Sequence, residues 1–249
     1  MKPFNLTALT LLILTACNSA PTKQEITTVK KSNIEIPNET KQLLVVTTDN
    51  WSTKDGVLQR YEKIDKEWKK VGESISIVLG RNGLGWGRGL HTTPKDAKII
   101  KKEGDGKAPA GLFSLKNAFG YSDLKINFPY SVYKRTDHCV DDSNSIWYNK
   151  IIDSTKVERD YKSFEHMKLK NSLYKYGIVV NHNPEAIANG GSCIFIHIKS
   201  PTGSGTAGCT AMNEKKIVKV LKWLKGEDKP LLLQLPKEEM VKVDLKLSQ

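Results

Sequence analysis

The sequence predicts a mainly β fold with a few helices in a single domain. Short apolar or alternating segments recur along the chain and are separated by glycine, proline and polar residues, which is typical of strands joined by turns. The chain has 249 residues, 39% of them hydrophobic and 27% charged, a composition typical of a globular domain. No internal repeat is present. These observations favour one domain over residues 41–249.

The expected strands follow from these apolar runs. Residues 42–49 form a run rich in β-branched residues, and residues 56–64 and 74–80 alternate between apolar and polar. A glycine-rich segment (80–90) lacks the lysine-containing phosphate-binding pattern and is expected to be a closely packed turn. Further strands are expected at the end of 101–115 and within 176–183, 193–199 and 230–235.

The segment 193–199 has a period of two, which decides where its side chains point. Ile194, Ile196 and Ile198 share one face. Cys193, Phe195 and His197 share the other.

One helix is expected near the C-terminus. Asn213 is a suitable N-cap, and Gly226 is a suitable end. The apolar residues between them recur at helical spacing: Ile217, Val220, Leu221 and Leu224.

The N-terminus has the features of a secretory signal over residues 1–16. Lys2 precedes an apolar run (6–14), and the Leu-Thr-Ala-Cys stretch ending at Cys17 resembles the lipobox of bacterial lipoproteins. We therefore expect cleavage before Cys17, acylation of Cys17 as a membrane anchor, and a flexible tether over residues 17–40. The alternative is an ordinary signal peptide with a chance cysteine.

The net charge of +12 favours an anionic partner. Export argues against nucleic acid, so anionic cell-envelope material is the expected partner. The alternative is a surface of solvated lysines without a specific partner. Asn18 is not an acidic retention signal, which favours an anchor in the outer membrane with the domain facing the periplasm.

The cysteine count leaves one thiol in question. If Cys17 is acylated, Cys139, Cys193 and Cys209 remain, an odd number in an oxidising compartment. A Cys139–Cys193 bridge would leave Cys209 free, but the sequence does not establish this pairing.

Cys209 follows a run of small residues and comes twelve positions after His197. The connection between them is rich in glycine, serine and threonine, so it should turn and bring the two side chains together. A histidine that takes the proton of a thiol makes that thiol a nucleophile, and Gly208 would leave room beside it for a substrate carbonyl. The alternative is that Cys209 is a small buried hydrophobic residue and His197 a structural one.

The stretch GSCIFIHIKSPTGSGTAGCTAM (191–212) resembles the signature of the L,D-transpeptidase (YkuD-like) catalytic domain. In that family a histidine on a strand precedes a Ser/Thr-x-Gly-Cys turn. The resemblance extends to GRNGLGWG (80–87), KKEGDGKAPAGLFSLKNAFGY (101–121) and CVDDSNSIWYN (139–149).

The resemblance implies a β-sandwich-like domain with peripheral helices. The activity would be acyl transfer on peptidoglycan stem peptides, with Cys209 as nucleophile and His197 as general base. The N–H groups of Gly208 and Cys209 would bind the oxyanion, and Thr206 matches the Ser/Thr of the turn. We expect no cofactor and no metal.

Two positions depart from the family pattern. Ala207 stands where better-known members have histidine, and Ala211 stands where they have asparagine. A backbone carbonyl, or the side chain of His182 or Asn183, would then have to orient His197. The departures keep two alternatives open: an L,D-carboxypeptidase on the same scaffold, and a non-catalytic peptidoglycan-binding envelope lipoprotein.

Overall fold

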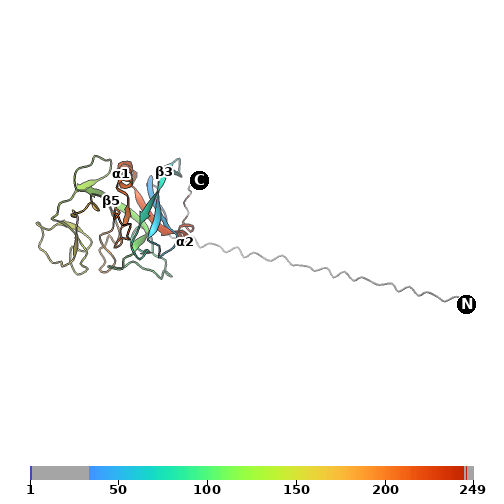
Figure 1. The fold of residues 1–249 in the computed structure, drawn as a ribbon, viewed down its shortest axis with the longest axis horizontal. Helices are drawn as coiled ribbons and strands as arrows, with labels where there is room; N and C mark the ends of the chain where they lie inside the picture. The colour runs from blue at the N-terminus through green and yellow to red at the C-terminus, as the bar shows by residue number, and fades with distance from the viewer. Residues whose placement is uncertain (2–33, 244, 246–249) are drawn as a thin grey trace.

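The computed structural model describes residue 1, residues 34–243 and residue 245. Figure 1 shows the fold as a β-rich body with two short helices, α1 and α2. In chain order the elements are β1 (Gln42–Thr48), β2 (Asp55–Ile64), β3 (Glu67–Val78), β4 (Leu84–Trp86), β5 (Ala108–Gly120), β6 (Tyr130–Val132), β7 (Asp137–Val140), β8 (Ile151–Asp153), β9 (Phe164–His166), β10 (Tyr176–Val180), β11 (Phe195–Ile198), β12 (Thr210–Met212), α1 (Glu214–Trp223), a 3-10 turn (Gly226–Asp228), β13 (Leu231–Pro236) and α2 (Lys237–Met240).

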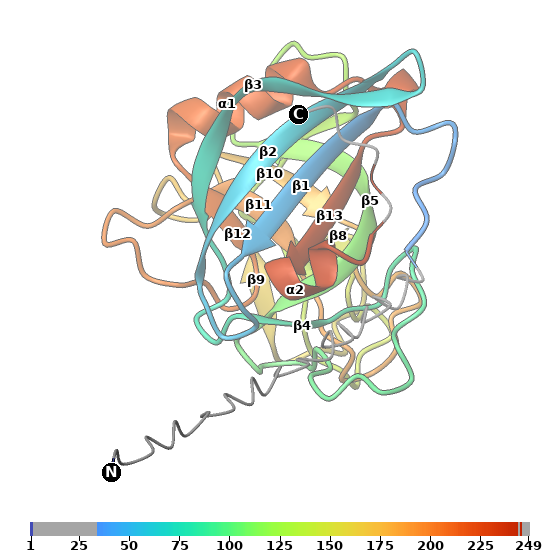
Figure 2. The same cartoon turned by 90° about the vertical axis from the view of Figure 1, so that its right-hand side faces the viewer.

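The main sheet closes on itself through the long strand β5. Its hydrogen-bonded order is β10-β11-β12-β3-β2-β1-β13-β5-β4, and β5 also pairs with β10. Residues 111–114 of β5 pair with β13, whereas residues 115–120 pair with β10. Figure 2 shows β3, β2, β1, β13 and β5 side by side. The expected mainly β, single-domain fold class with few helices is therefore confirmed, and the predicted sandwich takes the form of a closed sheet.

The expected strands lie where the apolar pattern places them, with shifts at their ends. β1 is a nearly continuous buried run because it lies inside the sheet between β2 and β13. β3 begins seven residues before the expected start at residue 74, since its polar first half pairs with β2 across a tight connection. The closely packed glycine-rich segment also contains the short strand β4, which pairs with the start of β5.

The two faces of β11 point into two different clusters, as its period of two predicts. Ile194, Ile196 and Ile198 lie in the main core inside the closed sheet. Cys193 and Phe195 lie in a second cluster on the outer face, together with Cys209. The cluster is covered by the small sheet β8-β7-β9, which belongs to a layer on one side of the molecule (Figure 1).

The helix α1 begins after Asn213 as expected. Asn213 has the extended backbone of an N-cap, but its side chain makes no capping hydrogen bond. The helix ends at Trp223 and not at Gly226, which instead begins the 3-10 turn. Its buried side is formed by Ile217, Val220 and Leu221, which pack into the main core.

Most of the predicted N-terminal segments lie outside the described residues. The signal over residues 1–16, the lipid anchor at Cys17 and the tether as far as residue 33 therefore stay predictions. The last part of the expected tether, residues 34–40, lies against the domain: Ile34 and Thr40 are buried, and Ile34 contacts the main core. Along the described chain, no helix is long and apolar enough to cross a membrane.

Candidate active site

Cys209 lies directly before β12, next to Phe195 at the start of the neighbouring strand β11. β11 and β12 are parallel, with Ile196 opposite Thr210 and His197 opposite Ala211. One step back along both strands, the N–H of Phe195 donates to the Cys209 Sγ at 3.3 Å. The thiol itself donates to the carbonyl oxygen of Cys193 at 3.6 Å, and only 5% of Cys209 is exposed. The strand pair therefore fixes the thiol from two sides.

The turn that carries Cys209 is held by the Thr206 hydroxyl. The Thr206 Oγ1 accepts the N–H of Gly208 at 3.1 Å and donates to the carbonyl oxygen of Cys209 at 2.6 Å. The Gly208 N–H, expected to bind an oxyanion, is thus already paired in this conformation. The N–H of Cys209 makes no hydrogen bond within the part of the chain that the structure describes.

Gly208 is a glycine for a packing reason. A Cβ at this position would lie 3.0 Å from the carbonyl oxygen of Lys107 and 3.3 Å from the Ile194 side chain. Room for a substrate carbonyl at Gly208 therefore does not lie in the direction of this Cβ. The space is filled by the segment that leads into β5.

His197 lies on the same face of β11 as Phe195, and its orientation is fixed by its own strand. Its Nδ1 is 2.8 Å from the carbonyl oxygen of Ile198, and since a carbonyl only accepts, Nδ1 carries the proton. Nε2 is then the nitrogen that can accept a proton. Burial lowers the pKa of His197 to about 4, so the imidazole is neutral at pH 7.

His197 and Cys209 share a sheet face but are not joined directly. They occupy diagonal positions of the parallel pair, since His197 faces Ala211 and the Cys209 Sγ accepts from Phe195. No hydrogen bond between the two side chains is present among the described residues. Burial raises the pKa of the Cys209 thiol well above its usual value, so the resting pair is a neutral thiol and a neutral imidazole.

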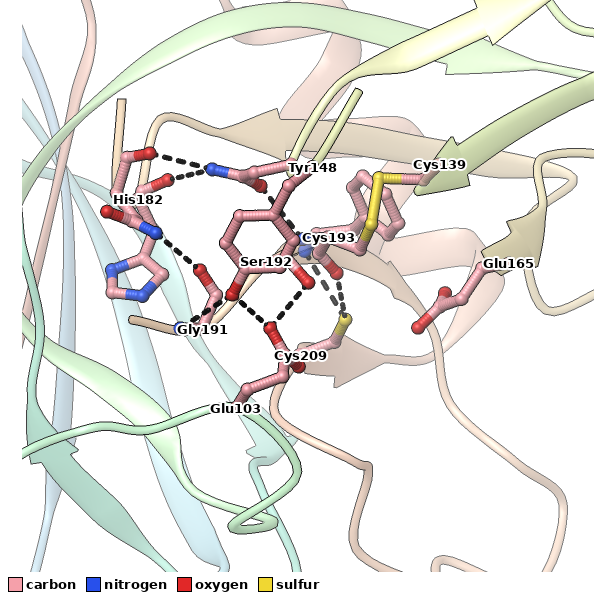
Figure 3. Close-up of a disulfide and its surroundings, with 12 residues drawn as sticks. Glu103, Cys139, Tyr148, Glu165, His182, Gly191, Ser192, Cys193 and Cys209 are labelled. Carbon is pink, nitrogen blue, oxygen red and sulfur yellow. Dashed lines mark hydrogen bonds between the residues drawn. A yellow bond between two sulfur atoms is a disulfide. The ribbon is translucent and has the colours of Figure 1, made fainter. Parts of the chain in front are cut away.

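The disulfide that the cysteine count left open is present. Cys139 on β7 is bonded to Cys193, with their Cα atoms 5.9 Å apart. Cys209 is the free cysteine in the described part of the chain. The bridge ties the small sheet to Cys193, whose carbonyl oxygen accepts the hydrogen bond from the Cys209 thiol. Figure 3 shows the bridge beside this thiol.

His182 and Asn183 do not support His197, so this prediction is wrong. β10 ends at Val180, and the next N–H, that of Asn181, donates to the Ser114 carbonyl of β5. The His182 ring bridges the Arg88 N–H and the Gly190 carbonyl. Asn183 binds the backbone of the same loop, at the residues Ile187 and Gly191.

Asn149 connects these two residues to the backbone of Cys193. The Asn149 amide donates to the carbonyl oxygens of His182 and Asn183, both at 2.8 Å, and accepts the N–H of Cys193 at 3.0 Å. Cys193 has a positive φ of 53°, a conformation that needs such support in a non-glycine residue. The hydrogen bonds of Asn149 therefore hold Cys193, whose carbonyl oxygen contacts the Cys209 thiol.

A Glu–Tyr pair anchors the loop before Cys193. Glu103 accepts hydrogen bonds from the Tyr148 hydroxyl and from the Ser192 hydroxyl, the latter at 2.7 Å. The Tyr148 oxygen in turn accepts the N–H of Gly191 at 3.1 Å. Figure 3 shows this pair beside the Cys193 loop.

A buried ion pair lies on the other side of the Cys209 turn. Lys101 is 3% exposed, and its Nζ lies 2.7 Å from the Asp105 carboxylate. A Cβ on Gly208 would be 3.8 Å from the Lys101 Cε, and the charge of Lys101 lowers the pKa of the Cys209 thiol, although by less than burial raises it. Asp105 also accepts hydrogen bonds from the N–H groups of Lys102 and Lys107. Asp105 therefore shapes the turn over residues 102–107.

A cavity of about 390 Å³ lies against the disulfide. Cys193 and Phe195 line it, and their backbone groups also hydrogen-bond to the Cys209 Sγ. Polar groups at the cavity include Lys116, Asn117 and Lys150. Among the described residues, no group of three or more His, Cys, Asp or Glu side chains is arranged to hold a metal.

The comparisons with known proteins give a likeness of fold only. No protein-family model matches the chain, and no curated protein matches it. A similar solved structure is that of the helical cell shape determining protein Pgp2 from Campylobacter jejuni, with 13% sequence identity and a TM-score of 0.42; the match covers 86% of this chain and 56% of that chain. A point mutant of the same protein gives the same values. The chain thus spans little more than half the length of that protein, and a likeness at this level does not assign a family.

Proposed function

We propose that the protein is a cysteine acyltransferase that acts on peptidoglycan stem peptides. Cys209 would form a thioester with the stem, and the reaction would be L,D-transpeptidation, as a cross-link or as exchange of the terminal D-amino acid. The observation that carries the proposal is the pairing of β11 with β12. It holds the free thiol of Cys209 on the same face as His197, whose Nδ1 is occupied by the Ile198 carbonyl and whose Nε2 can accept a proton.

The proposed steps use these groups in turn. The thiol loses its proton to the imidazole, and the sulfur attacks the carbonyl carbon between the L-centre and the terminal D-residue. The carbonyl oxygen becomes an oxyanion that the Cys209 N–H can bind. When the C–N bond breaks, the leaving amine takes a proton from His197, and an acceptor amine later attacks the thioester.

Both groups must become accessible during this reaction. Cys209 is 5% exposed and His197 is 6% exposed. Neither Cys209 nor His197 lines the neighbouring cavity, so the substrate reaches the sulfur only when the residues that cover it move. When these residues return to cover the site, they would keep water from hydrolysing the thioester.

The proposed location is the cell envelope, with a lipid anchor at Cys17 and the domain facing the periplasm. The signal-like residues 1–16 support export, and the Cys139–Cys193 bridge is of the kind that persists in oxidising compartments. The proposed partner is peptidoglycan, whose anionic groups suit a chain with a net charge of +12.

One observation favours the non-catalytic alternative. The resting thiol is neutral and hydrogen-bonded to a carbonyl, and no bond joins it to His197 in the described structure. A peptidoglycan-binding lipoprotein would keep this arrangement unchanged during function.

Incubation with tetrapeptide muropeptides and a D-amino acid, followed by mass spectrometry, separates these functions. We expect exchanged or dimeric products with the unaltered protein and none with Cys209→Ala. Loss of the terminal residue alone would identify a carboxypeptidase. Unchanged muropeptides that still bind both proteins would refute catalysis and identify a binding protein.

A further inference from the structure

The cavity beside the Cys139–Cys193 bridge lies between the main sheet and the small sheet. On the side of the main sheet it is lined by Val179 and Phe195, which lie opposite each other on β10 and β11. On the side of the small sheet it is lined by Ile151, which lies opposite Cys139. Its volume of about 390 Å³ is within the range of sites that bind small molecules.

A β-bulge brings two consecutive residues of β5 to this cavity. Along β10 the pairing with β5 steps by two residues, from 178 to 180, whereas along β5 it steps by three, from 118 to 115. Strand β5 therefore holds one extra residue at this point, and a bulge of this kind changes the direction of side chains. Consecutive residues of a regular strand point to opposite faces, but Lys116 and Asn117 both line the cavity.

The cavity carries positive charge and no negative charge. Lys116 and Lys150 line it, and both are exposed. No Asp or Glu residue lines it within the described part of the chain. His182 also lines it, but this side chain is neutral at pH 7, because burial lowers its pKa to about 3 and backbone groups occupy both ring nitrogens. An anion in this cavity would therefore meet cations and no carboxylate.

The ammonium group of Lys116 is available to bind such an anion. It forms no hydrogen bond and no ion pair with any residue that the structure describes. Lys150 donates one hydrogen bond to the Ile146 carbonyl at 3.1 Å, so two of its N–H groups remain. The amide N–H groups of Asn117, in contrast, are already bonded to protein oxygens. Lys116 is therefore the main donor that the cavity offers.

Glu165 of β9 faces the same layer but does not line the cavity. It lies opposite Cys139, and its carboxylate accepts a hydrogen bond from the Tyr174 hydroxyl. Burial raises the pKa of this carboxyl to about 7, and the hydrogen bond from Tyr174 opposes the shift. Glu165 is therefore bound to Tyr174, and the two lysines of the cavity have no acidic partner among the described residues.

We propose that this cavity binds a carboxylate-bearing segment of a short peptide. Lys116 would bind the carboxylate, supported by the charge of Lys150, and the apolar part of the peptide would pack against Val179, Phe195 and Ile151. These apolar walls favour a peptide over an inorganic anion such as phosphate, whose whole surface is polar.

The identity of the peptide rests on the proposed function, which makes it the peptidoglycan stem with its free carboxyl groups. Cys193 and Phe195 line the cavity, and their backbone groups also hydrogen-bond to the Cys209 Sγ. A stem held in the cavity therefore lies beside the residues that hold the thiol. It would be bound there before the residues that cover Cys209 move.

Isothermal titration calorimetry tests whether a carboxylate is recognised. The full chain carries Cys209→Ala so that no turnover accompanies binding. The probes are a tetrapeptide muropeptide and the same muropeptide with its carboxyl groups converted to carboxamides. We expect the acid to bind and the amide to bind at least about tenfold more weakly. Equal affinities, or no binding of the acid, would overturn the proposal.

Lysine variants test which residue binds the carboxylate. In Lys116→Gln we expect the affinity for the acid to fall about tenfold, as for the loss of one hydrogen bond to a charged group, and in Lys150→Gln about threefold. The matched control is Lys69→Gln, which makes the same change of charge at an exposed position of β3 outside the cavity. Lys116→Gln and Lys69→Gln that bind alike would exclude Lys116 as the anion-binding group.

Ile151→Trp tests whether the ligand enters the cavity. This substitution fills the space and keeps both lysines, so we expect binding of the acid to be lost. Far-UV circular dichroism and thermal unfolding check that the variant folds. Unchanged binding in a folded Ile151→Trp would show that the lysines hold the ligand on the surface only, and the cavity would not be its site.

Muropeptide turnover, measured in chains that retain Cys209, separates this proposal from the proposed function. Carboxylate-dependent binding that Lys116→Gln weakens, in a protein without turnover, supports the cavity as a binding site and refutes the proposed function. Turnover that depends on Cys209, with an unchanged KM in both Lys116→Gln and Ile151→Trp, supports the proposed function and refutes the binding site.

Discussion

Removal of the Cys139–Cys193 bridge should cost a large part of the stability of the domain. The bridge spans a sequence separation of 54 residues, and for a loop of that length the chain-entropy model gives a loss of about 4 kcal/mol in the free energy of unfolding. Both cysteines are buried, at 2% and 3% exposure, so replacing them by alanine also removes packed sulfur atoms. We therefore expect Cys139→Ala/Cys193→Ala to lose about 4 kcal/mol or slightly more.

Urea unfolding followed by tryptophan fluorescence at pH 7 measures this loss. Cys209→Ala is the matched control, because it removes a buried sulfur from the same cluster without opening a cross-link; it should lose only about 1 kcal/mol. A double variant that loses no more than the control would refute the reasoning. It would show that the bridge does not restrict the unfolded chain.

Two further outcomes follow from the hydrogen bonds of single side chains. Thr206→Val removes the two bonds that hold the Cys209 turn and should lower the free energy of unfolding by about 1–3 kcal/mol, whereas Thr206→Ser keeps the hydroxyl and should stay near wild type; equal losses in chemical denaturation would contradict this role. Burial lowers the pKa of His182 to about 3, below its value in the unfolded chain, so its contribution to stability is present above about pH 6.5 and is lost as the pH falls toward 3. In urea titrations between pH 7 and 4, His182→Gln should start less stable but lose stability less steeply than wild type, and parallel curves would show that His182 does not titrate in this range.

Sequence reasoning succeeded where the signal is local. The period of two over residues 193–199 correctly separated Ile196 from Phe195, because alternate residues of a strand point to opposite faces. The glycine-rich connection correctly predicted a turn before Cys209. The odd cysteine count indicated that a Cys139–Cys193 bridge would leave the Cys209 thiol free, and this bridge is present.

It failed where a residue depends on segments distant in the chain. His182 follows its strand by only two residues, but its ring and the Asn183 amide bind a later loop, at the carbonyl oxygens of Gly190 and Gly191. Gly208 faces Lys107, about a hundred positions away, and no local pattern shows that contact. Glu165 lies in a three-residue strand that has no apolar period of its own. Its position is set by the pairing of β9 with β7, the strand that the bridge attaches to Cys193.

The position of β13 has a consequence for how the chain folds. This strand, residues 231–236, lies between β1 and β5 and is parallel to β1. Its partner residues in β1 are 43–48, so almost the whole length of the domain separates the two strands in the sequence. Contacts of such high sequence separation form slowly, since a long loop must close before they are made. The closed sheet stays incomplete until this late strand is inserted, so folding waits for nearly the entire domain to emerge.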